Sequence, residues 1–327
     1  MQESHLRTID AYQNLKNINA QSHAIRTAVN LGIIAELRKG QASLEQIAGN
    51  CNLKPDGLRL VLEVLKASGL IEQYDEDYAL AQVGQVWPEQ LSDLGDRYWE
   101  HLEHWLQNDQ PIPQNPATPL DHQDYEIEHA ADAWWSTPAA LDAAKALSIG
   151  DDRKSLKILD LYSGGGIFSL VLLHHDPTAT ATLVDQAEKL TAARNNAGGM
   201  GNTNVIEWLE CNPTDAQLAP EQFDLVLISR QIHQLAPEEF EKALQIANRA
   251  LKPDGEIVLI DIFPGQSDGD LSRTVRELEL ALRTHGRPMA TPQAVEDQLK
   301  QHGFSEIRFA HLPATPKIFG LILARKA

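Results

Sequence analysis

Three consecutive glycines, Gly164–Gly166, come directly after a short apolar segment that predicts a buried strand over residues 157–161. A turn without Cβ atoms lets the backbone approach a ligand closely, and the N-terminus of a following helix favours a carboxylate or phosphate. Asp160 lies at the end of this strand, and Asp185 ends the next expected strand, where a carboxylate can accept hydrogen bonds from ribose hydroxyls. The pattern predicts an adenosine-type cofactor at Ser163–Gly166, although strand-end carboxylates also occur as plain caps.

A dinucleotide-binding turn would follow the pattern G-x-G-x-x-G. Here Gly164 and Gly166 are followed by Ser169 where the last glycine of that pattern would stand. The departure disfavours NAD without excluding it, so an NAD(P)-dependent enzyme remains a weaker alternative.

His233 follows an expected strand over residues 223–228, and Asp261 lies at the end of the next one, over residues 256–262. An imidazole titrates near neutrality, so His233 can take the proton of a hydroxyl group during a reaction. An ordinary loop histidine is the alternative, since the chain has 12 histidines. The acidic residues near the expected site are spread over several strands, which favours metal-independent chemistry.

Strands and helices alternate from residue 156 onward, which is typical of a doubly wound α/β sheet. The expected strands cover residues 157–161, 180–184, 205–210, 223–228, 256–262, 307–311 and 319–324. The expected helices cover residues 168–174, 188–196, 237–250 and 292–302. The loop between the last two strands is too short for a helical crossover, so we expect a mostly parallel seven-stranded sheet with an antiparallel last strand. Ligands bind such sheets at the carboxyl ends of the strands, where the strand order reverses.

Residues 1–90 predict three helices and a short β-ribbon, the arrangement of a winged helix. The expected helices cover residues 20–37, 43–48 and 55–68, and the expected strands cover residues 71–74 and 78–80. Ser43-Leu-Glu-Gln46 has the form of a capping box, and Pro55 suits the first turn of a helix. Because this region has more acidic than basic residues, we expect it to mediate dimerisation rather than DNA binding.

Residues 91–150 predict a helical connector between this region and a cofactor-binding domain over residues 151–327. The connector is rich in aromatic side chains: Tyr98, Trp99, Trp105, Tyr125, Trp134 and Trp135. They can form one wall of an apolar pocket for a small molecule, or they can serve only to pack the domains together.

The formal net charge of −18 argues against a nucleic-acid partner, because phosphate contacts require a basic face. The sequence has no uninterrupted apolar run of about 18 residues and no apolar leader, so neither a membrane span nor a secretion signal is expected. The two cysteines, Cys51 and Cys211, have no metal-ligand spacing. Two free thiols in a cytoplasmic protein are the simplest interpretation.

The segment Leu159-Asp-Leu-Tyr-Ser-Gly-Gly-Gly166 resembles motif I of class I S-adenosylmethionine (SAM)-dependent methyltransferases, with Tyr162 in place of the usual first glycine. A D-L-Y-x-G-x-G form is similar to the same motif in RNA uracil methyltransferases, which the rest of the chain does not resemble. Nearly the whole chain instead resembles the two-domain small-molecule O-methyltransferases of the plant caffeate and bacterial hydroxyneurosporene type. The segments that carry this resemblance are 28–37, 44–48, 60–70, 227–235 and 250–260.

The resemblance implies a Rossmann-like cofactor domain, a homodimer formed through the N-terminal domain, and SAM as the cofactor with S-adenosylhomocysteine (SAH) as product. It implies that His233 is the catalytic base and that Asp261 orients it, since a carboxylate on one ring nitrogen fixes the tautomer. The implied cofactor-binding residues are Asp160, Tyr162, Ser163, Gly164, Gly166, Asp185, Gln186, Asn212, Ser229 and Arg230.

The chain departs from the family pattern in three places. Gln234 and Leu235 replace an aspartate and a tryptophan after the histidine, and Met289 replaces a second glutamate. The aspartate expected near the adenine aligns with Asn212 or Cys211, and the carbonyl oxygen of Asn212 can accept from an adenine amino group.

The function expected from these residues is methylation of a hydroxyl group on a small, aromatic or polyketide-like molecule. Methylation at carbon or nitrogen by the same fold is an alternative, favoured by the missing family acids. A non-catalytic winged-helix regulator that senses a ligand is the alternative from another class.

Overall fold

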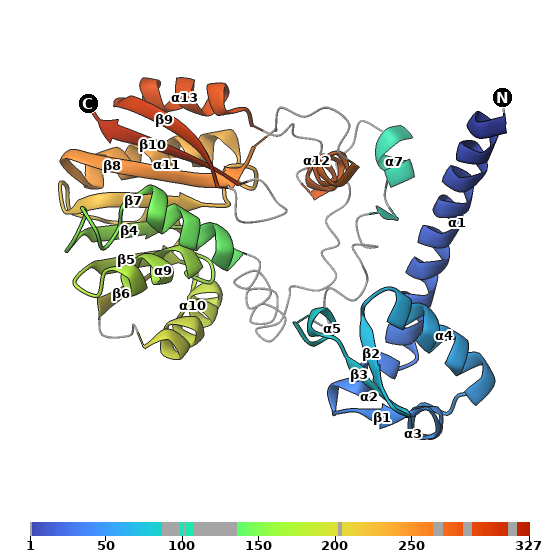
Figure 1. Ribbon diagram of the computed structural model, residues 1–327. Helices are drawn as coiled ribbons and strands as arrows, with labels where there is room; N and C mark the ends of the chain where they lie inside the picture. The colour runs from blue at the N-terminus through green and yellow to red at the C-terminus, as the bar shows by residue number, and fades with distance from the viewer. Residues whose placement is uncertain are drawn as a thin grey trace. The chain divides into compact units, whose positions relative to one another are not determined.

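The computed structural model describes residues 2–86, 99–100, 102–107, 136–201, 205–263, 271–283, 290–312 and 319–327. The chain divides into two compact units, Met1–Asp96 and Arg97–Ala327 (Figure 1). Of the six aromatic residues in the predicted connector, Trp99 and Trp105 are partly buried, and the others lie outside the described residues, as does Met289.

The first unit contains the helices α1 (Gln2–Asn30), α2 (Ile33–Arg38), α3 (Leu44–Asn50), α4 (Pro55–Ala67) and α5 (Gln82–Val86). The prediction of one helix over residues 20–37 is wrong, because the helix is interrupted between α1 and α2. At the break, Gly32 has a φ of 78°. Glycine adopts this left-handed conformation without the clash that a Cβ atom would cause, and the conformation ends the helical hydrogen-bond ladder.

Local signals set the boundaries of the next elements. The Ser43 hydroxyl accepts from the Gln46 amide at 3.3 Å, and the Gln46 side chain accepts from the Ser43 amide at 2.8 Å, which confirms the predicted capping box. Pro55 stands in the first turn of α4, as expected. The strands are β1 (Ala42–Ser43), β2 (Ile71–Tyr74) and β3 (Asp77–Leu80). β2 and β3 form the predicted hairpin, and β1 adds to the free edge of β3.

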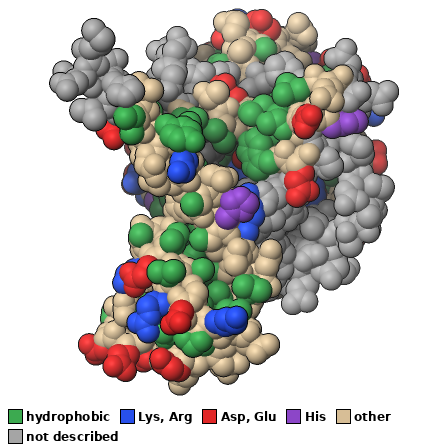
Figure 2. All heavy atoms as spheres, turned by 90° about the vertical axis from the view of Figure 1, so that its right-hand side faces the viewer, with side chains coloured by type: hydrophobic (Ala, Val, Ile, Leu, Met, Phe, Trp, Pro, Cys, Tyr) green, Lys and Arg blue, Asp and Glu red, His purple; other side chains and the backbone are tan. Residues whose placement is uncertain are grey.

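Helices α1 and α4 expose several large hydrophobic side chains. They are Ile9, Tyr12, Leu15 and Ile18 on α1, and Leu60 and Val64 on α4. In Figure 2, hydrophobic side chains lie among charged ones on the face of the molecule that is shown. Exposed apolar surface of this kind is typical of a protein–protein contact. None of the helices that the structure describes combines the length and apolar character needed to cross a membrane.

The second unit is built on a seven-stranded sheet with the order β6-β5-β4-β7-β8-β10-β9. The strands are β4 (Lys157–Leu161), β5 (Thr180–Asp185), β6 (Ile206–Glu210), β7 (Phe223–Ser229), β8 (Leu251–Ile262), β9 (Phe304–Leu312) and β10 (Phe319–Lys326). Strands β4 to β8 pair in parallel, and β10 pairs antiparallel with both β8 and β9. This confirms the predicted mostly parallel sheet with an antiparallel end, although β8 begins at Leu251, before its expected start.

Helices cover both faces of this sheet (Figure 1). They are α9 (Ile167–His175), α10 (Ala187–Met200), α11 (Pro237–Ala250) and α13 (Pro292–Gln301), and the unit also contains α7 (Leu102–Gln107) and α12 (Leu271–Arg283). One core joins α9, α10 and a helix over residues 136–146 to the sheet, and a second core joins α11 and α13 to it. The strand order reverses between β4 and β7, so the carboxyl ends of these strands meet at the point where such sheets bind ligands.

Candidate active site

The turn between β4 and α9 has an unusual backbone. Tyr162, Gly164 and Gly166 all have positive φ angles, of 61°, 54° and 71°. A Cβ atom at Gly166 would lie 3.0 Å from Leu183 Cδ2 and 3.3 Å from Ala193 Cβ, so only glycine lets the turn pack this closely against β5 and α10. The tight packing places the turn at the carboxyl end of β4, where the sequence predicts the cofactor.

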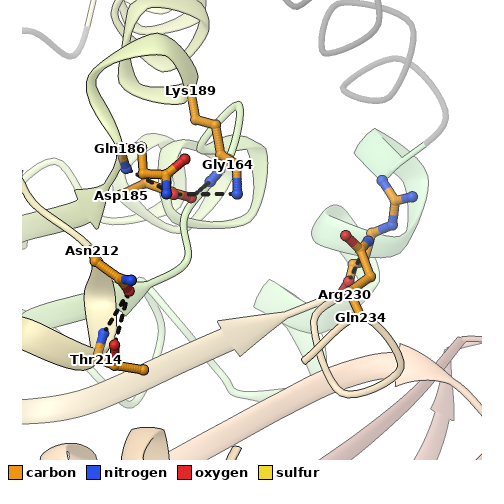
Figure 3. Close-up of polar contacts among 8 residues, drawn as sticks. All are labelled: Gly164, Asp185, Gln186, Lys189, Asn212, Thr214, Arg230 and Gln234. Atoms are coloured by element: carbon orange, nitrogen blue, oxygen red, sulfur yellow. Dashed lines mark hydrogen bonds and ion pairs between the residues drawn. The ribbon is translucent and has the colours of Figure 1, made fainter. Parts of the chain in front are cut away.

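Asp185, at the end of β5, is bonded to this turn (Figure 3). Its Oδ2 accepts from the Gly164 amide at 3.0 Å, and its Oδ1 accepts from the Gln186 amide at 2.9 Å. Lys189 Nζ lies 3.4 Å from Oδ1. The carboxylate thus fixes the glycine turn against the second strand. Sequence reasoning missed Lys189, which the helical spacing of four residues from Asp185 could have indicated.

Asn212 follows β6 and caps a short 3₁₀ helix over residues 213–215. Its side-chain oxygen accepts from the Thr214 amide at 3.1 Å and from the Thr214 hydroxyl at 2.9 Å (Figure 3). Both lone pairs of that oxygen are therefore used within the chain, whereas the sequence interpretation assigned this oxygen to an adenine amino group. The Asn212 amide nitrogen remains as a donor for a ring nitrogen of a base.

A cavity of about 200 Å³ lies at the carboxyl ends of β4, β5, β6 and β7. It is lined by Tyr162, Asp185, Gln186, Lys189, Asn212, Pro213, Gln231, Gln234, Leu235 and Glu239. Four of these are predicted cofactor residues: Tyr162, Asp185, Gln186 and Asn212. Sequence reasoning did not assign the other six to the cofactor. Apart from Lys189, these residues lie on the segments that follow β6 and β7 and in the first turn of α11. They reach the cavity only because those segments fold back over the strand ends.

Tyr162 combines strain with an unpartnered polar group at the cavity. Its left-handed φ costs a residue with a Cβ atom roughly 1–2 kcal/mol. The side chain is buried, and its hydroxyl has no hydrogen-bond partner within the described part of the chain. Burial raises the pKa of the Tyr162 phenol well above its usual range, and three nearby carboxylates act in the same direction: Glu239, Asp185 and Asp215. The phenol therefore stays protonated and can donate to a ligand.

Replacing Tyr162 with glycine should weaken SAM binding about tenfold, because a large ring that lines the cavity is lost. Isothermal titration calorimetry with SAM measures the change. Tyr162→Phe is the matched control, since it keeps the ring and removes only the hydroxyl; any loss in this variant reports a hydrogen bond from the phenol. An unchanged affinity in Tyr162→Gly would contradict a place for Tyr162 beside the cofactor.

Asp160 lies within β4, fully buried and away from the cavity lining. The Ser169 hydroxyl donates to its Oδ2 at 2.5 Å, and its Oδ1 has no hydrogen-bond partner in the described ranges. Burial raises the pKa of Asp160 to about 7; the Ser169 hydrogen bond opposes this rise, and the charge of Asp185 adds to it. Asp160 thus joins β4 to α9 through Ser169 and is not exposed to solvent.

Asp160 should make the folded protein less stable as the pH rises from about 4 to about 7. Within this window the folded state keeps a proton that the unfolded chain has lost, so the free energy of unfolding falls with rising pH. The asparagine of Asp160→Asn stays neutral at every pH. At pH 8 the free energy of unfolding of this variant should therefore exceed that of the wild type by up to a few kcal/mol, whereas the two proteins should differ little near pH 4. Urea unfolding without cofactor at several pH values measures this. Parallel pH profiles of the two proteins would contradict it.

The remaining predicted cofactor residues lie near the cavity without lining it. Ser163 is buried, with a hydroxyl that has no partner among the residues described, and Ser229 is buried at the end of β7. Arg230 also has a positive φ of 60°, and its guanidinium donates to the Ser136 hydroxyl at 3.3 Å. Its backbone oxygen accepts from the Gln234 side chain at 3.1 Å (Figure 3). Arg230 therefore links the loop after β7 to the helix over residues 136–146.

His233 and Asp261 come together at the ends of neighbouring strands. His233 Nδ1 lies 2.9 Å from Asp261 Oδ1, and both side chains are buried. Asp261 also accepts from the Ile232 amide at 2.9 Å and from the Ile262 amide at 2.8 Å, so the carboxylate is held on both sides. His233 Nε2 is buried and has no partner in the parts of the chain that are described. A histidine with one nitrogen held by a carboxylate and the other unbonded has the geometry of an oriented general base.

Two family matches cover the chain's two units separately. Residues 14–89 match the O-methyltransferase dimerisation domain, and residues 158–255 match a methyltransferase domain. Malonyl-acyl-carrier-protein O-methyltransferase from Methylococcus capsulatus is 33% identical over 161 residues, which cover 46% of this chain and 53% of that protein. The chain thus matches about half the length of that relative.

Two solved structures have the same fold over almost their whole length. The mitomycin 7-O-methyltransferase MmcR has a TM-score of 0.78 at 19% identity and covers 100% of both chains. Human N-acetylserotonin methyltransferase in complex with SAM has a TM-score of 0.73 at 20% identity, with 97% of this chain and 98% of that chain covered. The chain therefore contains an O-methyltransferase dimerisation domain and a methyltransferase domain, and it has the fold of enzymes whose solved structures hold SAM or SAH.

Proposed function

We propose that this enzyme methylates a hydroxyl group of a small aromatic or polyketide-like molecule, with His233 as general base. The observation that carries the proposal is the buried His233–Asp261 pair with its unbonded Nε2. Asp261 holds the proton on Nδ1, which leaves the lone pair of Nε2 free to take the acceptor's hydroxyl proton. A positioned base of this kind contributes about 10²–10⁴ to the rate.

The cavity beside the glycine turn fits the nucleoside part of SAM. Asp185 offers a carboxylate for ribose hydroxyls, the Asn212 amide offers a donor for the base, and the Tyr162 hydroxyl is an unused donor. Bound SAM supplies the methyl group, activated by its sulfonium. The chain's own contribution is to hold both reactants and exclude water, and such positioning can lower a barrier by roughly 7–11 kcal/mol.

The proposed reaction needs no metal ion, because a base alone can remove the acceptor proton. In the described ranges, no group of three or more His, Cys, Asp or Glu side chains is arranged to hold a metal. We therefore propose that turnover persists in the presence of a chelator such as EDTA.

We also propose a homodimer formed through residues 1–90, a connector over residues 91–150 that contributes to the acceptor pocket, and a cofactor domain over residues 151–327. The dimerisation-domain match and the exposed hydrophobic side chains of α1 and α4 support the first point. Neither the sequence nor the site suggests a nucleic-acid partner. The unpaired Cys51 and Cys211 are consistent with the cytoplasm, which is the location that we propose.

Calorimetric titration with SAM and SAH tests the cofactor site directly. Both should bind well below millimolar concentration, and Asp185→Ala should weaken binding at least about tenfold because a charged hydrogen-bond acceptor is lost. NADH is the control ligand and should not bind. Release of SAH from SAM in the presence of a panel of phenols and hydroxylated polyketides then tests the reaction. Absence of binding by both SAM and SAH would contradict the proposal.

A further inference from the structure

Gly320, on β10, lies where a side chain would disturb the candidate base. It is paired directly with Asp261 on β8 and with His311 on β9. Residues directly opposite each other in antiparallel strands have their side chains on the same face of the sheet. A side chain at position 320 would therefore stand beside the carboxylate that holds His233.

Two aromatic rings fill the space that Gly320 leaves. A Cβ atom at this position would lie 2.5 Å from Phe263 Cδ2 and 2.6 Å from Phe309 Cε2, closer than side chains tolerate. The backbone of Gly320 does not require glycine, because its φ is not in the left-handed region. Glycine at this position is therefore explained by the need for room.

The two rings form a continuous edge-to-face path to the candidate base. Phe263 packs against Phe309 with ring centroids 5.6 Å apart and an interplanar angle of 86°. Phe263 also packs against His233, with centroids 6.4 Å apart and an angle of 64°. Phe263 is buried, whereas Phe309 is 39% exposed. Because the Phe263 ring is buried and packs against His233, we expect a displacement of this ring to be transmitted to the imidazole.

We infer that Gly320 is a positioning residue: it makes room for Phe263 and Phe309, whose packing fixes the ring of His233 so that Nδ1 faces Asp261. The carboxylate alone leaves the imidazole free to tilt about its single hydrogen bond. Phe263 limits that tilt, so Nε2 keeps one direction. This inference rests on the proposed role of His233, but its test needs neither the acceptor nor turnover.

Nitrogen-15 NMR of the full-length protein with labelled histidine reports the tautomer of His233 directly. Assignment uses His233→Ala. At a pH where the ring is neutral, the wild type should show a proton on Nδ1 and a bare Nε2. Gly320→Ala should lose this signature in favour of a mixture of tautomers, and Gly320→Ala combined with Phe309→Leu should recover it at least in part, because the smaller side chain restores room for Phe263.

Two further variants keep the test decisive. Gly255→Ala is the matched control. Gly255 lies in β8, the strand that contains Asp261, but toward the other end of that strand. The added Cβ would lie 3.0 Å from both Leu251 Cδ2 and the Lys252 carbonyl oxygen. It should keep the wild-type signature. Phe263→Leu removes the ring without adding an atom, so it replaces Gly320→Ala if that protein does not fold, and it should also lose the signature.

SAH affinity, measured by calorimetry, confirms that each variant is folded and should stay within about twofold of the wild type, because the cofactor cavity shares no residue with this cluster. Retention of the wild-type signature by folded Gly320→Ala, or by Phe263→Leu, overturns the inference. If His233→Ala keeps full turnover while these variants still change the tautomer, the proposed function fails and the positioning role stands.

Discussion

His233→Ala should lower kcat at least about 10²-fold, because the acceptor proton then has no positioned base to receive it. The affinity for SAM should not change, since His233 is not among the residues that line the cofactor cavity. Single-turnover measurement of SAH formation, with an acceptor found in the panel assay, separates the chemical step from binding and product release.

His174→Ala is a suitable control, since it removes an exposed imidazole from α9 in the same unit and should keep wild-type turnover. Full activity in His233→Ala would remove the base from the reaction. That result would favour methylation at nitrogen or carbon, where the acceptor can be reactive without losing a proton to the enzyme. The replacement of the family's aspartate and tryptophan by Gln234 and Leu235 makes this the principal alternative.

Asp261→Asn should reduce kcat by a similar or larger factor, at least about 10²-fold. Asparagine has nearly the same size, but its amide group can present a donor toward His233 Nδ1, which favours the tautomer with the proton on Nε2. That tautomer cannot accept a proton from the substrate. The carboxylate also accepts from the amides of Ile232 and Ile262, so a loss of stability of about 1–3 kcal/mol is expected as well.

A double-mutant cycle separates these two effects of Asp261→Asn. If Asp261 acts through His233, the variant that combines Asp261→Asn with His233→Ala should be about as slow as His233→Ala alone. Additive losses in kcat would mean that Asp261 affects the reaction by another route. Urea unfolding of all four proteins shows whether the stability losses follow a different pattern from the rates.

The sequence predicted the positions of residues that lie at strand ends. His233 and Asp261 lie at the carboxyl ends of neighbouring parallel strands, and such ends meet at one edge of the sheet. Their closeness therefore follows from the strand order rather than from the conformation of individual side chains. The same holds for Asp185 and the glycine turn. The direction of the Asn212 oxygen was not predictable, because it depends on a local hydrogen bond to Thr214 that competes with any ligand.

The sequence did not predict the residues that reach the site from loops or across long-range pairings. Gln231 and Glu239 line the cavity together with Asp185 because the segment after β7 turns toward the end of β5. The hydrophobic pattern of the sequence does not predict the course of that segment. The position of Gly320 opposite Asp261 depends on the register of β10 against β8. The sequence has 20 glycines, and no local pattern distinguishes Gly320 from the others outside the glycine turn.

The antiparallel insertion of β10 between β8 and β9 has a consequence for the order in which the protein is completed during synthesis. Strands β4 to β8 and the glycine turn leave the ribosome well before residues 319–326, so the cofactor half of the domain can assemble first. Until β10 arrives, β8 has an unpaired edge beside Asp261. A nascent chain can therefore form the glycine turn and its bond to Asp185 while the His233–Asp261 pair is still unsupported, and that pair is completed only when β10 joins the sheet.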